Sequence, residues 1–127
     1  MTLSPTTKIL IVDDQVTMIR IIRGMMQQMG FSNLEHALHG AAALEELEKG
    51  GYGLIISDWN MEPMNGLELL KAVRQHPTLK TTPFIMVTAE NKKENILAAV
   101  EAGVNNYIVK PFNTDTLKAK LDHVFRK

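Results

Sequence analysis

Several side chains that can do acid, metal or phosphoryl chemistry stand directly after short apolar runs of the sequence. They are Asp13, Asp14, Asp58, Thr88 and Lys110. Three carboxylates held close together cannot all stay ionised without a counter-charge, and Mg²⁺ meets this need with oxygen ligands and retained waters. A site that adds an ammonium group and a hydroxyl donor is suited to receive a phosphoryl group, which a carboxylate can accept as an acyl phosphate.

The apolar runs predict the framework that would bring these side chains together. Short runs rich in branched residues are typical of strands buried on both faces, and the segments between them have helical periodicity. The expected strands are 8–12, 34–38, 53–57, 84–87 and 107–109. The expected helices are 15–29, 41–49, 66–75 and 92–102, with a last helix capped by Asn113 or Thr114.

Helical periodicity also predicts which side chains face the core. In the first helix these are Met18, Ile22, Met25 and Met29, widened by Ile19 and Met26. In the later helices they are Leu67, Leu70, Val73, Ile96, Ala99, Val100, Leu117, Leu121, Val124 and Phe125.

Strands that alternate with helices imply a parallel sheet covered by helices on both faces. Five such units favour an α/β fold of the flavodoxin-like (βα)5 type, a three-layer sandwich with strand order 2-1-3-4-5. Ligands then bind beyond the carboxyl ends of the strands, where the order reverses between the first and third strands. Asp13, Asp14 and Asp58 are therefore expected to meet there, with Thr88 and Lys110 from the adjoining strands.

The position of each carboxylate suggests its role. Asp58 would end the central third strand and is the best candidate for a nucleophile. The adjacent Asp13 and Asp14 are better placed to hold the metal, helped by a backbone carbonyl of loop 59–61. Taken alone, each of these residues is as easily a helix cap or a loop side chain. Their convergence from separate strands favours a common site.

Length and composition limit what the protein can be. The 127 residues make one domain, 1–127, with a core from about residue 8 to residue 126. The 14 Lys and Arg residues balance the 14 Asp and Glu residues, so the basic excess of a nucleic-acid-binding protein is absent. There is no cysteine, which excludes disulfides and thiolate chemistry, and no apolar run approaches the ~20 residues of a membrane helix. We therefore expect a cytoplasmic monomer that binds neither nucleic acid nor membrane.

The motifs together resemble a known family. The stretches that carry the resemblance are Ile11-Val-Asp-Asp14, Ile56-Ser-Asp-Trp-Asn-Met61, Gly66-Leu-Glu-Leu-Leu70, Val87-Thr-Ala-Glu90, Lys93-Glu-Asn95, Ala102-Gly103 and Val109-Lys-Pro-Phe112. They are similar to the receiver domains of two-component response regulators, and among these to the single-domain chemotaxis regulators of the CheY type. The resemblance extends from Lys8 to Phe125, and its combination of Asp-Asp, Asp, Thr and Lys-Pro is highly specific.

The resemblance implies that Asp58 is a phosphoacceptor, which takes a phosphoryl group from a phosphohistidine on a histidine kinase. Asp14 would bind Mg²⁺ directly and Asp13 largely through water, and the backbone carbonyl of Asn60 would be a further ligand. Lys110 would contact the phosphoryl oxygens, and its peptide bond to the following proline is expected to be cis.

The resemblance also implies a switch. The Thr88 hydroxyl would move onto the new phosphate, and Tyr107 would fill the vacated space; Tyr107 as a half-buried strand aromatic that does not switch is the alternative. The surface of the fourth helix, fifth strand and fifth helix would then change. Candidates for contact with a partner on it are Asn91, Lys93, Asn95, Val104, Tyr107 and Lys120.

The function implied is a stand-alone switch in bacterial chemotaxis. A CheA-like histidine kinase would be the phosphodonor, a component of the flagellar motor switch the output partner, and a phosphatase a further partner. Because the chain ends at the fifth expected helix, no output domain is expected, and no external substrate is turned over. Asn60 and Glu90 stand where the family tunes hydrolysis of the acyl phosphate, and they favour a short-lived signal.

Some positions depart from the family pattern. Glu62, followed by Pro63, stands where a proline is common and adds a negative charge near the metal site. Asn65 stands where an aspartate is frequent, and Gln15 replaces an apolar residue. Val104-Asn105-Asn106 also differs, which leaves the identity of the partner open.

Other functions remain as alternatives. A phosphorelay intermediate or phosphate sink would have the same site. An aspartyl phosphatase of the haloacid dehalogenase type requires a second aspartate two residues after the nucleophile, where Asn60 stands. A flavodoxin-like nucleotide carrier requires a phosphate loop rich in glycine or hydroxyl groups, whereas Asp13 and Asp14 would repel phosphate. The four histidines are scattered, so a solvated surface is favoured over a metal site.

Overall fold

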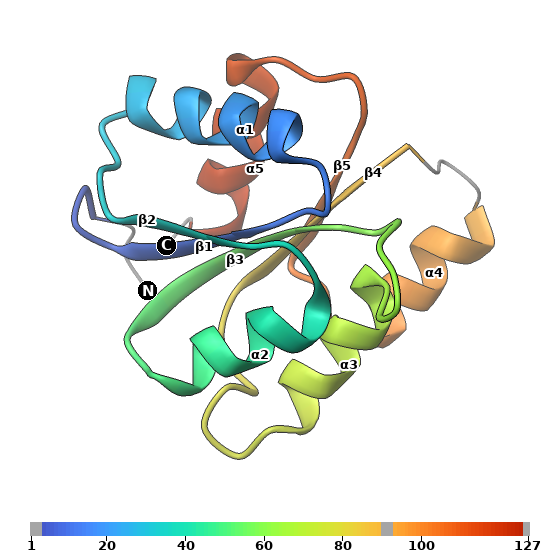
Figure 1. Cartoon of the computed structure of the whole chain (residues 1–127). Coiled ribbons are helices and arrows are strands. Elements are labelled where there is room, and N and C mark those ends of the chain that lie inside the picture. The colour runs from blue at the N-terminus through green and yellow to red at the C-terminus, as the bar shows by residue number, and fades with distance from the viewer. Residues whose placement is uncertain (1–3, 90–92, 126–127) are drawn as a thin grey trace.

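The computed structural model describes residues 4–89 and 93–125, which form strands and helices in strict alternation (Figure 1). The strands are β1 (Lys8–Val12), β2 (Leu34–Ala37), β3 (Tyr52–Asp58), β4 (Phe84–Thr88) and β5 (Asn106–Val109). The helices are α1 (Val16–Gln28), α2 (Gly40–Glu48), α3 (Gly66–Gln75), α4 (Lys93–Glu101) and α5 (Thr114–Val124). Every expected strand and helix is present. Both Asp58 and Thr88 lie within strands, one residue further than the apolar runs predicted.

The strands form one parallel sheet in the order β2-β1-β3-β4-β5, which confirms the predicted flavodoxin-like fold. At the carboxyl end of β1, Val12 lies opposite Ala37 of β2 and Ser57 of β3. Helices α1 and α5 cover one face of the sheet, and α2, α3 and α4 cover the other (Figure 1). None of the helices in the described part of the chain has the length and apolar character needed to cross a membrane.

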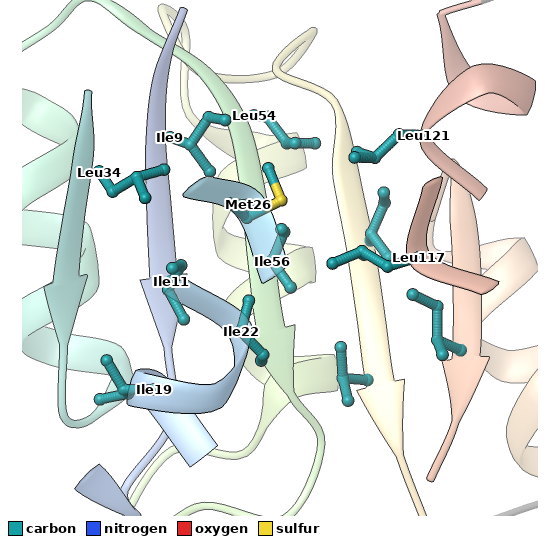
Figure 2. Close-up of a cluster of buried hydrophobic side chains, with 13 residues drawn as sticks. Ile9, Ile11, Ile19, Ile22, Met26, Leu34, Leu54, Ile56, Leu117 and Leu121 are labelled. Atoms are coloured by element: carbon teal, nitrogen blue, oxygen red, sulfur yellow. The ribbon is translucent and has the colours of Figure 1, made fainter. Parts of the chain in front are cut away.

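The central strands contribute side chains to two separate cores, because successive strand residues point to opposite faces of the sheet. Ile9 and Ile11 of β1 lie with Leu117 of α5 in the core beneath α1 and α5 (Figure 2). Leu10 and Val12 lie in the core beneath α2 and α3. Since β1 is buried on both faces, its sequence is uniformly apolar, and its carboxyl end is held between two packed layers.

The periodicity-based prediction of the buried face holds for α1 but only in part for α4. In α1, the predicted residues Ile19, Ile22 and Met26 are buried, and Met18, Met25 and Met29 are partly buried and packed against the same core. In α4, the prediction for Val100 is wrong: it is 56% exposed, and Ala99 is the one fully buried residue of the helix. Apolar residues occupy much of the circumference of both helices, so packing against the sheet, rather than hydropathy, decides which of them face inward.

Side chains fix the starts of two helices at the carboxyl edge of the sheet. At α3, the side chain of Asn65 accepts a hydrogen bond from the backbone N–H of Glu68, whose carboxylate accepts one from the N–H of Asn65. This capping box satisfies two amides that the helix itself cannot pair. At α5, Asn113, rather than Thr114, is the cap and accepts from the N–H of Thr116 at 2.9 Å.

Candidate functional site

Three carboxylates meet beyond the carboxyl ends of β1 and β3. Asp13 and Asp14 directly follow β1, and Asp58 is the last residue of β3. One carboxylate oxygen from each of the three lies within 4.8 Å of the others. Asp13 is 1% exposed and Asp58 5% exposed, whereas Asp14 is open to solvent. The predicted convergence of these residues is present, in a geometry in which one cation can contact all three.

Lys110 supplies a positive charge to this cluster from the end of β5. Its Nζ lies 3.1 Å from Oδ1 of Asp58 and 3.9 Å from Oδ2 of Asp13. The backbone N–H of Lys110 donates to the carbonyl oxygen of Thr88, at 2.8 Å, so the lysine is held against the end of β4. The bond between Lys110 and Pro111 is cis, as predicted.

The charges of the site are not balanced by protein groups alone. Oδ1 of Asp13 accepts from the N–H of Gln15 at 2.9 Å, whereas its buried Oδ2 has no hydrogen-bond partner. Burial is the main cause that raises the pKa of Asp13 to about 6; the carboxylates of Asp58 and Asp14 act in the same direction, and the Gln15 N–H and Lys110 oppose them. An orphaned oxygen in an all-oxygen cluster fits a hard divalent cation such as Mg²⁺.

Close backbone packing positions Asp58. The N–H of Trp59 donates to the carbonyl of Val87 at 3.0 Å, and the carbonyl of Trp59 accepts from the N–H of Gly66 at 2.8 Å. A Cβ at Gly66 would clash with the carbonyl oxygen of Asp58 and would lie 2.9 Å from Cα of Trp59. Only glycine therefore lets α3 begin directly against the peptide that carries the nucleophile candidate.

Thr88 and Tyr107 lie on neighbouring strands beside this cluster. Thr88 is buried at the end of β4, and Tyr107 of β5 is half-buried and paired with Met86. A small apolar pocket is lined by Thr88, Tyr107, Trp59 and residues of α4. The two residues that were predicted to switch, Thr88 and Tyr107, therefore line one small pocket together.

A comparison with known proteins agrees with this geometry. The family model of the response regulator receiver domain matches residues 9–122. The chain belongs to this family. Receiver domains are signalling proteins rather than conventional enzymes, and they typically bind Mg²⁺; the three carboxylates of this receiver domain could hold such an ion.

Relatives of the receiver domain include named chemotaxis proteins. Chemotaxis protein CheY-3 of Vibrio cholerae is 48% identical over 125 residues, which cover 98% of this chain and 96% of the relative. Chemotaxis protein CheY of Pseudomonas aeruginosa is 47% identical over 120 residues, 94% of this chain and 97% of the relative. The receiver domain is thus homologous to chemotaxis response regulators, as its motifs indicated.

Solved structures agree with the fold. The structure of V. cholerae chemotaxis protein CheY4 matches with a TM-score of 0.87 and 36% identity, covering 94% of this chain and 98% of that one. A two-component response regulator from Clostridium difficile matches with a TM-score of 0.86 and 28% identity, covering 96% and 98%.

The other predicted site residues that the structure describes lie in the loop after β3 and along the segment from α4 to α5. Asn60 is exposed and lines an open groove with Asp14 and Glu62, and the bond from Glu62 to Pro63 is cis. Of the predicted partner surface, Lys93 is exposed, and Asn95, Val104, Tyr107 and Lys120 are half-buried. Nζ of Lys120 lies 5.3 Å from the centre of the Tyr107 ring. Glu90 and Asn91 lie outside the described residues.

The sequence analysis did not predict the position or contacts of several residues near the site and on the predicted partner surface. Leu97 and Val100 of α4 are large apolar side chains, 50% and 56% exposed, on the helix that was predicted to contact a partner. Gly66 was assigned to a helix with no role in placing Asp58, although a glycine at a helix start is a signal of close packing. His39, predicted as solvated surface, is exposed but also caps α2, because its Nδ1 accepts from the N–H of Ala42 at 3.2 Å.

Proposed function

We propose that the receiver domain is a phosphorylation-activated switch in which Asp58 accepts a phosphoryl group from a histidine kinase. The observation that carries this proposal is the convergence of Asp13, Asp14 and Asp58 within 4.8 Å, with the ammonium group of Lys110 at 3.1 Å from Asp58. A carboxylate beside an ammonium group and a cation site can attack phosphorus, because charge that develops on the phosphoryl oxygens is compensated.

In the proposed step, a carboxylate oxygen of Asp58 attacks the phosphorus of phosphohistidine. A P–O bond forms as the P–N bond breaks, and the electron pair of that bond leaves with the imidazole, which takes up a proton. Asp13, Asp14, Asp58 and the backbone carbonyl of Asn60 would hold Mg²⁺, which neutralises charge on the phosphoryl oxygens when bound. Lys110 contacts those oxygens and orients the product.

The phosphoryl group then changes the surface of the domain. It adds charge and strong acceptors at the edge of the sheet, toward which the Thr88 hydroxyl moves. Tyr107 turns into the space that Thr88 leaves, within the apolar pocket that both residues line. The partner surface of α4, β5 and α5 responds, through Asn91, Lys93, Asn95, Val104, Tyr107 and Lys120.

We place this switch in a cytoplasmic chemotaxis pathway, because the relatives with 47–48% identity are named chemotaxis proteins. The donor is then a CheA-like histidine kinase, the output partner a flagellar motor component, and a phosphatase or the positions of Asn60 and Glu90 set the lifetime of the signal. The domain acts as a monomer, and its reactions are confined to its own Asp58.

The decisive experiment combines acetyl phosphate as donor, Mg²⁺ and the single tryptophan, Trp59, as reporter. We expect Mg²⁺ to quench Trp59 fluorescence and intact-protein mass spectrometry to detect one phosphoryl adduct, which Asp58→Asn abolishes. Asp122→Asn makes the same change on the exposed surface of α5 and should leave the adduct intact. An undiminished adduct in Asp58→Asn overturns the proposal, and sustained turnover of a phosphate monoester would favour the aspartyl phosphatase instead.

A further inference from the structure

β5, which carries Tyr107 and directly precedes Lys110, is one of the two four-residue strands at the edges of the sheet. It is paired with β4 alone. A slip of one residue would turn every side chain of a strand to the opposite face, and the register is specified most strongly where one face is buried. In β5 only Ile108 is buried, so burial specifies the register of this strand less strongly than that of the apolar central strands. Contacts beyond the regular pairing with β4 therefore contribute to the register of β5.

Asn105, which directly precedes β5, makes a reciprocal contact with the first residue of β4. Its backbone N–H donates to the carbonyl of Phe84 at 2.9 Å, and its side-chain Oδ1 accepts from the N–H of Phe84 at 2.8 Å. The regular pairing begins one residue later, where Asn106 lies opposite Ile85. Asn105 thus closes the amino end of the β4–β5 pair in one register only, because its amide oxygen replaces a backbone acceptor.

Arg74 of α3 holds Asn105 and both loops at this end of the sheet. Its Nη2 donates to Oδ1 of Asn105 at 2.8 Å, and its Nε donates to the carbonyl of Gly103 at 2.9 Å. Its Nη1 donates to the carbonyls of Thr82 at 2.6 Å and Lys80 at 3.2 Å. One planar guanidinium therefore joins the segment before β4 to the segment before β5.

We propose that Arg74 and Asn105 form a register clamp, and that Arg74 is a positioning residue for phosphoryl transfer. The clamp acts through β5: it fixes where the strand starts, and so where Tyr107 and Lys110 stand relative to Asp58. Asn105, which differs from the family pattern, is thereby assigned to the placement of a strand rather than to partner recognition. The effect on phosphoryl transfer rests on the function proposed above, whereas the clamp itself does not.

Amide hydrogen exchange of the whole, metal-free protein tests the clamp. Arg74→Lys keeps the charge but loses the fork of donors, and Asn105→Ala removes the shared acceptor. Each variant should speed exchange in β5 about tenfold relative to β1, as expected for the loss of a charge-assisted hydrogen bond that restrains local opening. Arg20→Lys, on the exposed side of α1, makes the matched change and should leave the profile unaltered.

Phosphorylation by acetyl phosphate tests the consequence for the site. Arg74→Lys and Asn105→Ala should slow adduct formation severalfold. The Mg²⁺ affinity, measured by Trp59 quenching, should stay unchanged, because the three carboxylates follow β1 or end β3 and none of them lies on β5. The double variant should be no slower than the worse single variant, since both disable one clamp. A merely structural role would instead speed exchange in all strands and weaken Mg²⁺ binding as well.

The outcomes separate the two proposals. The clamp is overturned if the Arg74 and Asn105 variants exchange the amides of β5 no faster than Arg20→Lys does. It is also overturned if exchange in β1 rises as much as exchange in β5. Unchanged phosphorylation alongside fast β5 exchange overturns the positioning role of Arg74. If the unmodified protein forms no adduct at all, the proposed function fails, and the exchange data still decide whether the clamp exists.

Discussion

Among single residues, Asp13 carries a buried carboxylate that protein groups compensate only in part. It is buried, one of its oxygens has no hydrogen bond, and it faces the carboxylates of Asp14 and Asp58. The pKa of Asp13 is therefore raised from 3.8 to about 6, chiefly by burial. The same ionised oxygen that suits a metal costs folding free energy when no cation is bound.

Asp13→Asn should make the metal-free protein more stable at pH 7, by about 1–3 kcal/mol, because it removes a poorly compensated buried charge. Well below pH 3.8, Asp13 is protonated in both the folded and the unfolded state, so the two proteins should differ least there. Between pH 4 and 6 the folded state binds more protons, so the stability of the unsubstituted protein falls relative to the variant as pH rises. Chemical denaturation in EDTA across this range measures the difference.

The matched control for that pH series is the exposed Asp122, which is 64% exposed. Asp122→Asn should show a nearly constant offset from pH 4 to pH 7. A gap between Asp13→Asn and the unsubstituted protein that narrowed with rising pH would contradict the assignment.

Lys110→Met should strengthen Mg²⁺ binding and weaken phosphoryl acceptance. Removing a cation 3.1 Å from Asp58 leaves the carboxylates with more negative charge, so Mg²⁺ affinity should rise roughly three- to tenfold. Loss of a contact to the transferred group should slow adduct formation by at least about tenfold. Trp59 quenching measures the Mg²⁺ affinity and intact-protein mass measures adduct formation, with Lys71→Met at an exposed position as the control. A loss of Mg²⁺ affinity together with the loss of adduct formation would contradict the proposed role of Lys110.

At the scale of secondary structure elements, the start of α3 against the end of β3 positions Asp58, the proposed nucleophile. Gly66 is the first residue of α3, and its N–H donates to the carbonyl of Trp59. There is no room for a side chain, because Met86 and the Asp58–Trp59 peptide occupy the space. The capping box at Asn65 fixes the same helix start, so helix and strand are held together from two sides.

Gly66→Ala should lower the free energy of unfolding by about 1–3 kcal/mol, since the new methyl group forces backbone to move. It should also slow phosphorylation by acetyl phosphate, because the displaced backbone is that of Asp58. Gly24→Ala is the matched control: a Cβ there meets nothing within 4 Å, so alanine should stabilise α1 by about 0.5–1 kcal/mol. Denaturation midpoints and adduct rates test both; a neutral Gly66→Ala would show that the contact is not restrictive.

The convergence of Asp13 and Asp58 was predictable, because strand–helix alternation fixes the sheet order and the apolar runs locate the strand ends. The exposure of Val100 was not, because a short helix with apolar residues on several sides takes its rotation from packing. The hydrogen bond between Arg74 and Asn105 joins residues 31 positions apart, so no periodic pattern in the sequence predicts it.

For the molecule as a whole, a metal ion bound at the three carboxylates would couple binding to folding. An ion that binds only the folded state stabilises it by mass action, by about 2.7 kcal/mol at a concentration of 100 times its Kd. Mg²⁺ should therefore raise the melting temperature, EDTA should reverse the rise, and Asp14→Asn should reduce it. Differential scanning fluorimetry measures the shift. A melting temperature indifferent to Mg²⁺ would contradict a metal site built from these carboxylates.

The two ends of the sheet differ in how well their connecting loops should tolerate changes in sequence. All strands run in parallel, so the reactive groups gather on one rim, and the connections at the other, such as the exposed Gly50–Gly51 turn between α2 and β3, carry none of them. Both glycines have positive φ angles, of 88° and 86°, which makes this a tight and solvent-facing bend. A short tag or fluorophore-bearing loop inserted there would report on the domain in living cells while leaving its chemistry undisturbed.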